Sequence, residues 1–140
     1  MRHAQWLSVS FFAIFLVCGA AQADQLKFTA DLAPGPGITS SGKGAATASL
    51  DTATKTLTWS VEYSGLSGPA TAAHIHGPAD PGADAGVVVP FTGNLVSPIT
   101  GSATLTDTQI AQLEAGKWYV NIHTAANKGG EIRGQLVHAP

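Results

Sequence analysis

Residues 56–63 alternate strictly between apolar and polar side chains, and this pattern strongly limits how the chain can fold. The apolar positions are Leu57, Trp59, Val61 and Tyr63. Successive side chains of a β-strand point to opposite faces, so this segment fits a strand with one buried face. Residues 45–50 alternate in the same way, and only a short turn separates the two segments. We therefore expect an antiparallel hairpin.

Turns rich in Gly, Pro, Asn and Asp divide the rest of the chain into further short segments. The expected strands are residues 25–32, 45–50, 56–63, 72–76, 87–91, 102–105, 117–124 and 131–137. Pro90 has no N–H to offer a neighbouring strand, so it favours a sheet edge. The turn at 125–130 should join the last two strands into a hairpin. Such a series of short strands predicts an all-β fold, an antiparallel sandwich or barrel.

One short helix is expected between the strands. Thr106 and Gln109 stand in the register of a capping box, which marks a helix start. Ile110 and Leu113 give the helix a buried stripe, and Gly116 can end it. The residue pattern therefore predicts an all-β, antiparallel sandwich or barrel with one short helix.

The N-terminal residues 1–23 are predicted to be a signal peptide. They combine a basic start, an apolar segment at 6–17 and a small-x-small cleavage site that ends at Ala23. Cleavage there leaves residues 24–140 as one domain, periplasmic or secreted, without contact with the membrane. Lipoprotein processing at Cys18 is the less favoured alternative. Because Cys18 is the only cysteine, the cleaved protein would have no disulfide.

The charge balance of the chain is mildly acidic. Seven Lys and Arg stand against nine Asp and Glu, and they form no basic stripe. Nucleic acid is therefore not expected as a partner. The sequence also lacks a serine in a nucleophile elbow, a cysteine nucleophile in residues 24–140 and a phosphate-binding glycine loop. Their absence argues against the enzyme classes that need these groups.

Three histidines are the candidate metal ligands. His74 and His76 are two residues apart on an expected strand, so they share a face, with Cα atoms roughly 6.6 Å apart. His123 lies on another expected strand and can supply a third ligand. Imidazole suits copper, zinc, nickel or iron. Copper is the first choice in an oxidising compartment without thiols, and zinc the second; the alternative is ordinary packing of the histidines on a polar sheet face.

Other polar residues have two interpretations each. Tyr119 and Asn121 share a strand face with His123, and they either orient the histidines or fix the strand register. Register is the favoured interpretation. Glu131 and Arg133 are expected on one face of the last strand. There Arg133 either binds an anion or, as we favour, makes a structural ion pair or backbone contact.

Asp80 and Asp84 lie in the Gly- and Pro-rich loop that follows His76. Turn formation is the favoured interpretation of these residues. Calcium binding is an alternative, because calcium prefers carboxylate and carbonyl oxygens, although the spacing fits no calcium loop. A third interpretation has one of them complete the histidine site.

Four sequence segments resemble the chordin-type domain, known as CHRD. They are residues 73–77 (AHIHG), 86–88 (GVV), 113–124 (LEAGKWYVNIHT) and 130–136 (GEIRGQL). The resemblance covers nearly the whole of residues 24–140. It implies that the fold is an antiparallel Greek-key β-sandwich, immunoglobulin-like or superoxide-dismutase-like. CHRD domains occur beside growth-factor-binding modules in chordin and as stand-alone exported bacterial proteins, for which the resemblance implies no firmly assigned chemistry.

A weaker similarity links the histidines to copper/zinc superoxide dismutases. These enzymes also place a His-x-His on one strand and another copper ligand on a late strand, as His74, His76 and His123 are arranged. The metal-bridging histidine, the zinc-binding cluster and the cysteine pair have no counterpart in the sequence. We therefore expect metal binding or buffering. The alternatives are a structural or adhesion module with envelope or extracellular protein partners, and a dismutase-like enzyme.

Overall fold

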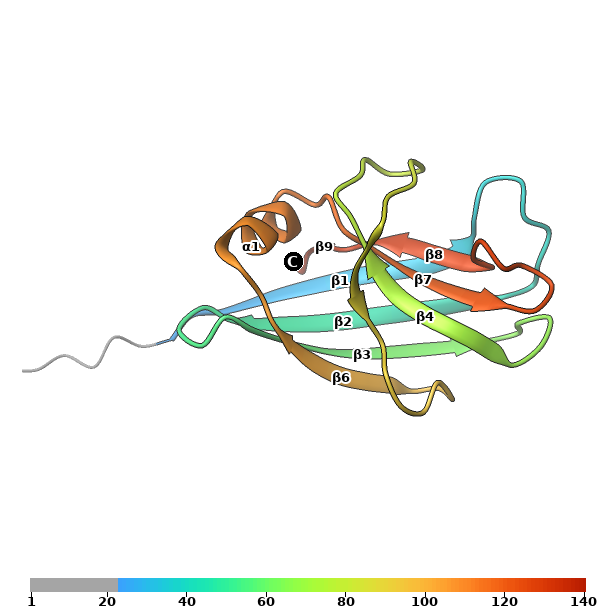
Figure 1. Ribbon diagram of the computed structural model, residues 1–140, viewed down its shortest axis with the longest axis horizontal. Helices are drawn as coiled ribbons and strands as arrows, with labels where there is room; N and C mark the ends of the chain where they lie inside the picture. Colours follow the sequence, from blue (N-terminus) through green and yellow to red (C-terminus); the bar gives the residue numbers. More distant parts are fainter. Residues whose placement is uncertain (1–22) are drawn as a thin grey trace, which may run out of the picture.

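The computed structural model describes residues 23–140, which form nine strands and one helix (Figure 1). The elements are β1 (Gln25–Pro34), β2 (Lys43–Asp51), β3 (Thr56–Ser64), β4 (Ala70–His76), β5 (Val87–Pro90), β6 (Ile99–Thr104), α1 (Asp107–Glu114), β7 (Tyr119–Thr124), β8 (Ile132–Gln135) and β9 (Val137–His138). Every pairing between strands is antiparallel. The predicted all-β fold with one short helix is confirmed for these residues.

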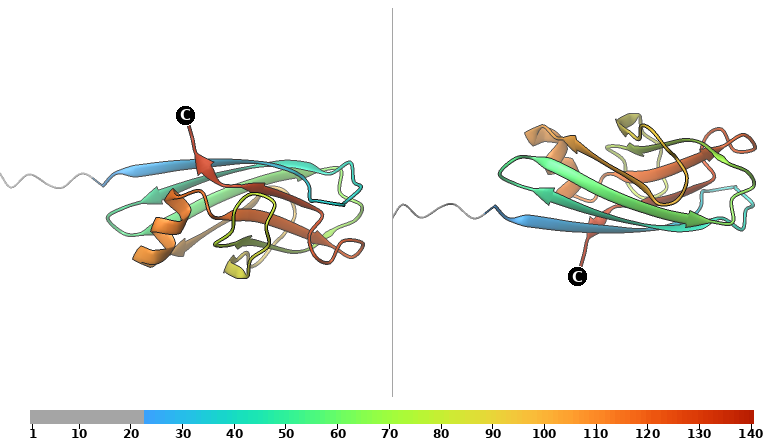
Figure 2. Two further views of the ribbon diagram at one scale, coloured as in Figure 1. Left: turned by 90° about the horizontal axis from the view of Figure 1, so that it is seen from above. Right: turned by 90° about the horizontal axis from the view of Figure 1, so that it is seen from below.

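The strands form two layers, which Figure 2 shows edge-on. One layer has the order β1-β2-β3-β6, and the other has the order β5-β4-β7-β8. β1 joins the layers, because residues 25–32 pair with β2 whereas Ala33 and Pro34 pair with β8. The connections from β3 to β4 and from β5 to β6 cross between the layers. This is the expected Greek-key sandwich, and β5 with Pro90 lies at an edge as predicted.

The apolar faces predicted from the alternation fill the space between the layers. Leu57 and Val61 of β3 are fully buried, and Trp59 is 6% exposed. Ala48 of β2 lies opposite Trp59, which confirms the predicted hairpin. The Trp59 ring stacks on Phe91, which follows β5, with 4.8 Å between the ring centroids. This contact ties the two layers together through a large apolar surface.

The helix α1 begins and ends where the sequence indicated. The Thr106 hydroxyl accepts a hydrogen bond from the Gln109 N–H, and the Gln109 side chain accepts one from the Thr106 N–H. Gly116 follows the helix with φ of 69°, a conformation that glycine adopts without strain. Leu113 is buried and Ile110 packs against the core, so the predicted stripe is also confirmed.

The predicted strand 131–137 is divided in two. β8 pairs with β7, whereas β9 pairs with β1. Between them, Leu136 is buried and donates its N–H to the Trp118 carbonyl. The chain changes its pairing partner at this point, and no local sequence pattern marks such a change. β6 also differs, since it begins at Ile99 rather than at residue 102.

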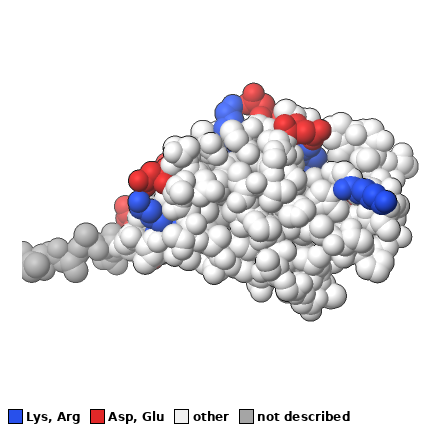
Figure 3. All heavy atoms as spheres, viewed as in Figure 1, with Lys and Arg blue, Asp and Glu red and all other residues white. Residues whose placement is uncertain are grey.

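The predicted signal peptide lies outside the described residues except for Ala23, and so does Cys18. Within residues 23–140, no helix has the length and apolar character needed to cross a membrane. Figure 3 shows that charged side chains are sparse on one face, and several of them lie beside a side chain of opposite sign. The ion pairs found among the described residues are Lys55–Asp107, Lys117–Asp80 and Arg133–Asp84.

Candidate metal centre

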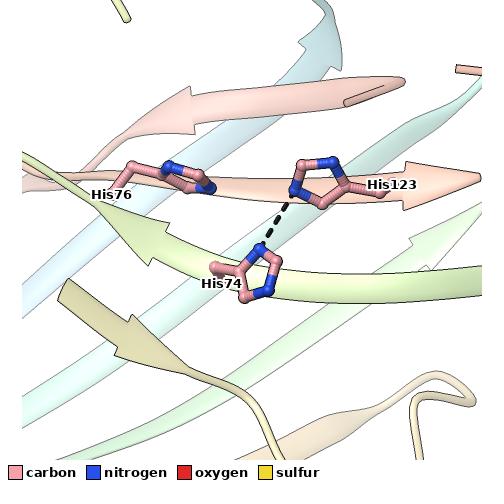
Figure 4. Close-up of side chains that lie close together, drawn as sticks. All are labelled: His74, His76 and His123. Carbon is pink, nitrogen blue, oxygen red and sulfur yellow. Dashed lines mark hydrogen bonds between the residues drawn. The ribbon is translucent and has the colours of Figure 1, made fainter. Parts of the chain in front are cut away.

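β4 carries two of the three candidate histidines on its outer face. Ala73 and Ile75 of this strand are fully buried in the core. Because side chains alternate along a strand, His74 and His76 project from the opposite face. Figure 4 shows the His74 ring on β4 and the His76 ring near the end of this strand, both on the side where His123 lies. The same-face spacing predicted from the sequence therefore holds in the folded chain.

β7 brings the third histidine beside them. β4 and β7 are antiparallel neighbours, and their register pairs Ala72 with His123 and His74 with Asn121. His123 is therefore the diagonal neighbour of His74 on the same face, a position from which side chains can touch. Figure 4 shows the His123 ring beside the other two. Residues far apart in the sequence are thus brought together by strand pairing.

The three rings are close enough to share one ion. One ligand nitrogen from each histidine can be chosen so that all three lie within 4.8 Å of one another. The closest pair, His74 Nδ1 and His123 Nε2, is 3.1 Å apart. Nitrogens bound to one ion at about 2 Å are roughly 3 to 4 Å apart. The three ring nitrogens therefore need to move only slightly closer to one another to bind the same ion. The histidine cluster can therefore hold a metal ion.

The ring of His76 is held in one orientation. Its Nδ1 lies 2.9 Å from the carbonyl oxygen of Ala85. A carbonyl can only accept, so Nδ1 carries the proton and donates it. His76 is 8% exposed, and its Nε2 is buried without a hydrogen-bond partner in the structure. His76 therefore presents a buried, unprotonated nitrogen with a free lone pair.

A backbone carbonyl also fixes the orientation of the His123 ring. Its Nδ1 donates to the carbonyl oxygen of Lys128 over 2.8 Å, so in the neutral ring Nε2 carries no proton. His74 Nδ1 must then supply the proton of the 3.1 Å hydrogen bond to His123 Nε2. A metal ion that displaces this proton would have Nδ1 of His74 and Nε2 of the other two histidines as ligands. Carbonyl partners of this kind are typical of histidines that bind metals.

The surroundings keep two of the rings neutral. Burial lowers the pKa of His74 below its ordinary value of 6.5, and the nearby His123 and His76 lower it further. Burial also lowers the pKa of His76, although its hydrogen bond to Ala85 acts in the opposite direction. Metal ions bind the neutral imidazole, so these shifts favour binding near neutral pH.

A comparison with protein-family models matches the CHRD domain over residues 28–136. The chain belongs to the CHRD domain family. The match runs from β1 to the residue after β8, includes all three histidines, and confirms the resemblance seen in the sequence. Comparisons of this CHRD domain with curated proteins and with solved structures found no match.

Two neighbours of the histidines in the CHRD domain have different contacts. Tyr119 lies opposite His76, and the two rings stack with centroids 5.1 Å apart and an angle of 8° between their planes. Asn121 lies opposite His74 on the same face, but its amide donates to the Gly129 carbonyl and lies against Gly130. Tyr119 therefore contacts the histidine cluster directly, whereas Asn121 holds the turn after β7.

The acidic residues of the loop 77–86 pair with basic side chains and are not members of the histidine cluster. Asp80 pairs with Lys117, and Asp84 pairs with Arg133 over 2.7 Å. Among residues 23–140 of the CHRD domain, the three histidines are the only group found that could hold a metal ion. The two aspartates therefore anchor the loop in this structure. The ion pair of Arg133 agrees with the structural role favoured from the sequence.

Glu131 differs from the expectation that it shares a strand face with Arg133. β8 begins only at Ile132, and the Glu131 side chain is fully buried. Its carboxylate accepts hydrogen bonds from Ser40, Ser67, Thr124 and Asn127. Burial acts to raise the pKa of Glu131, but the hydrogen bonds outweigh it and lower the pKa to about 2. This environment could not be predicted from the sequence, since Ser40 and Ser67 lie in loops that are distant along the chain.

Proposed function

We propose that this CHRD domain binds one transition-metal ion, copper first and zinc second, through His74, His76 and His123. The observation that carries the proposal is the Nε2 of His76, which is buried and has no partner among the described residues. Buried polar nitrogens nearly always have one. A metal ion held also by His123 Nε2 and His74 Nδ1 would supply it.

The choice of copper rests on the ligand set. Residues 24–140 contain no sulfur, since the chain's only Cys and Met are Cys18 and Met1. Three imidazoles suit Cu(II) and zinc, while soft sulfur ligands would favour Cu(I). Copper also stands above zinc in the affinity order of divalent ions. Three protein ligands leave a coordination position open for water or another small molecule.

The proposed role is metal binding or buffering in the periplasm or outside the cell. This location follows from the signal peptide predicted for residues 1–23 and is part of the proposal. In such a compartment, a site made only of imidazoles has no thiol that could be oxidised. The carbonyl groups that orient His76 and His123 support a site that is arranged before the ion arrives.

The test is a titration of metal-free protein, produced from the full chain, with Cu(II), Cu(I) and zinc. We expect one ion per chain in the wild type. The double variant His74→Ala/His76→Ala should lose at least about 100-fold in affinity, because two of three ligands are gone. His138→Ala is the matched control, since His138 packs on Phe28 outside the cluster. Unchanged affinity and stoichiometry in the double variant would show that the proposal is wrong.

A further inference from the structure

The loop between β4 and β5, residues 77–86, supplies the carbonyl that orients His76. Its ends are joined by a hydrogen bond from the Gly77 N–H to the Gly86 carbonyl. Near its end, the Ala85 carbonyl accepts the proton of His76 Nδ1 over 2.9 Å. The tautomer of His76 therefore depends on where the segment 83–85 lies.

Apolar packing contributes little to holding this segment. Ala83 and Asp84 are exposed and Ala85 is half-buried, and none of them has a large apolar side chain. Without a buried anchor of its own, a loop of this composition depends on hydrogen bonds for its position.

Arg133 of β8 provides two of these hydrogen bonds. Its Nη1 donates to the Asp84 carboxylate over 2.7 Å, and its Nη2 donates to the Ala83 carbonyl over 2.6 Å. Tyr119 adds a third contact, because its hydroxyl accepts the Ala85 N–H over 3.1 Å. Each residue of the segment is thus bound to a side chain that projects from β7 or β8.

The guanidinium of Arg133 is itself fixed in place. Its Cζ lies 3.7 Å from the centroid of the Tyr119 ring, and the Arg133 side chain is only 13% exposed. Tyr119 is 2% exposed and stacks on His76. A planar guanidinium can lie flat on the ring while its in-plane fork of N–H groups donates two hydrogen bonds, whereas an ammonium group has no flat face to stack.

We infer that Arg133 is a positioning residue for the metal centre. It holds the segment 83–85 where the Ala85 carbonyl keeps His76 protonated at Nδ1 and therefore free at Nε2. When the contacts of Arg133 with this segment are lost, His76 also populates the tautomer that is protonated at Nε2. That tautomer cannot bind a metal ion through Nε2. The consequence for metal affinity rests on the proposed function, whereas the consequence for the tautomer does not.

The experiment compares full-chain protein with its Arg133→Met variant. Long-range proton–nitrogen NMR of the metal-free proteins reports the tautomer of each histidine, and titration with Cu(II) reports affinity. We expect His76 to change from the Nδ1–H form to a mixture, with roughly a 10- to 100-fold loss of affinity. His123 should keep its tautomer, because its carbonyl partner, Lys128, lies in a different turn.

Lys117→Met is the matched control. It removes the ion pair with Asp80, which lies in the same loop but outside the segment 83–85, and should change neither readout. If Arg133→Met does not fold, Asp84→Ala takes its place. Asp84→Ala removes a carboxylate from a side chain that is 93% exposed. It should change the His76 tautomer and the Cu(II) affinity in the same direction, but by less.

The two proposals can fail separately. A folded Arg133→Met or Asp84→Ala protein with wild-type His76 tautomer and wild-type affinity would overturn the role of Arg133. If the wild type binds no metal but the variant still changes the His76 tautomer, the proposed function fails and the positioning by Arg133 stands.

Discussion

At the scale of single residues, Glu131 shows how a buried charge is stabilised in this domain. Its carboxylate accepts hydrogen bonds from the hydroxyl groups of Ser40, Ser67 and Thr124, and also from the backbone N–H of Ser67. These bonds favour the ionised form and outweigh the cost of burial. The charged carboxylate is therefore part of the folded structure and should contribute to its stability.

We predict that Glu131→Gln lowers the free energy of unfolding at neutral pH by about 2 to 4 kcal/mol, because an amide cannot accept all these donors. The pKa of Glu131 falls from 4.5 to about 2 on folding. Its stabilising effect is therefore present above pH 4.5 and is lost as the pH falls toward 2. In the variant, this part of the acid-induced loss of stability should disappear.

Urea unfolding at a series of pH values measures this effect. Glu62→Gln is the control, since Glu62 is exposed on β3. This variant should show the same dependence of the free energy of unfolding on pH as the wild type. If Glu131→Gln and wild type lose the same stability between pH 4.5 and 2, Glu131 does not have the role described here.

At the scale of elements, the hairpin of β7 and β8 places His123. Its turn supplies the Lys128 carbonyl that orients the His123 ring, and the Gly129 carbonyl accepts a hydrogen bond from Asn121. Gly130 has φ of 118°, which residues with a side chain rarely adopt. A Cβ at Gly130 would lie 2.0 Å from the amide oxygen of Asn121. The shape of the turn, and with it the orientation of His123, therefore requires glycine here.

We predict that Gly130→Ala destabilises the protein by about 2 to 4 kcal/mol, because it combines backbone strain with a clash against a buried side chain. Its metal affinity should fall roughly tenfold as the Lys128 carbonyl moves. Gly129→Ala is a close control, because a Cβ there meets nothing within 4 Å. Thermal unfolding and Cu(II) titration measure both effects. Equal stability of the two variants would contradict this account of the turn.

At the scale of the whole molecule, the sequence predicted what depends on local pattern. Alternation in residues 56–63 indicated the β2-β3 hairpin, and the His-x-His spacing placed His74 and His76 on one face. The CHRD resemblance supported the sandwich, and the capping box of Thr106 and Gln109 indicated where the helix begins. The predicted signal peptide stays a prediction, since it lies almost wholly outside the described residues.

Features that depend on distant parts of the chain could not be predicted. The donors to Glu131 include Ser40 and Ser67, which are 91 and 64 residues away in the sequence. The change of partner at Leu136 likewise depends on β1 and on Trp118. No spacing rule within one segment encodes such contacts, so they become visible only once the layers are assembled.

In the proposed metal centre, imidazoles from β4 and β7 converge on one ion. X-ray absorption at the copper edge, on protein loaded with one Cu(II) per chain, counts these imidazole ligands. We predict three imidazole nitrogens at about 2 Å in the wild type and two in His123→Ala. Fewer than three imidazole nitrogens in the wild type, or an unchanged spectrum in His123→Ala, would contradict the claim.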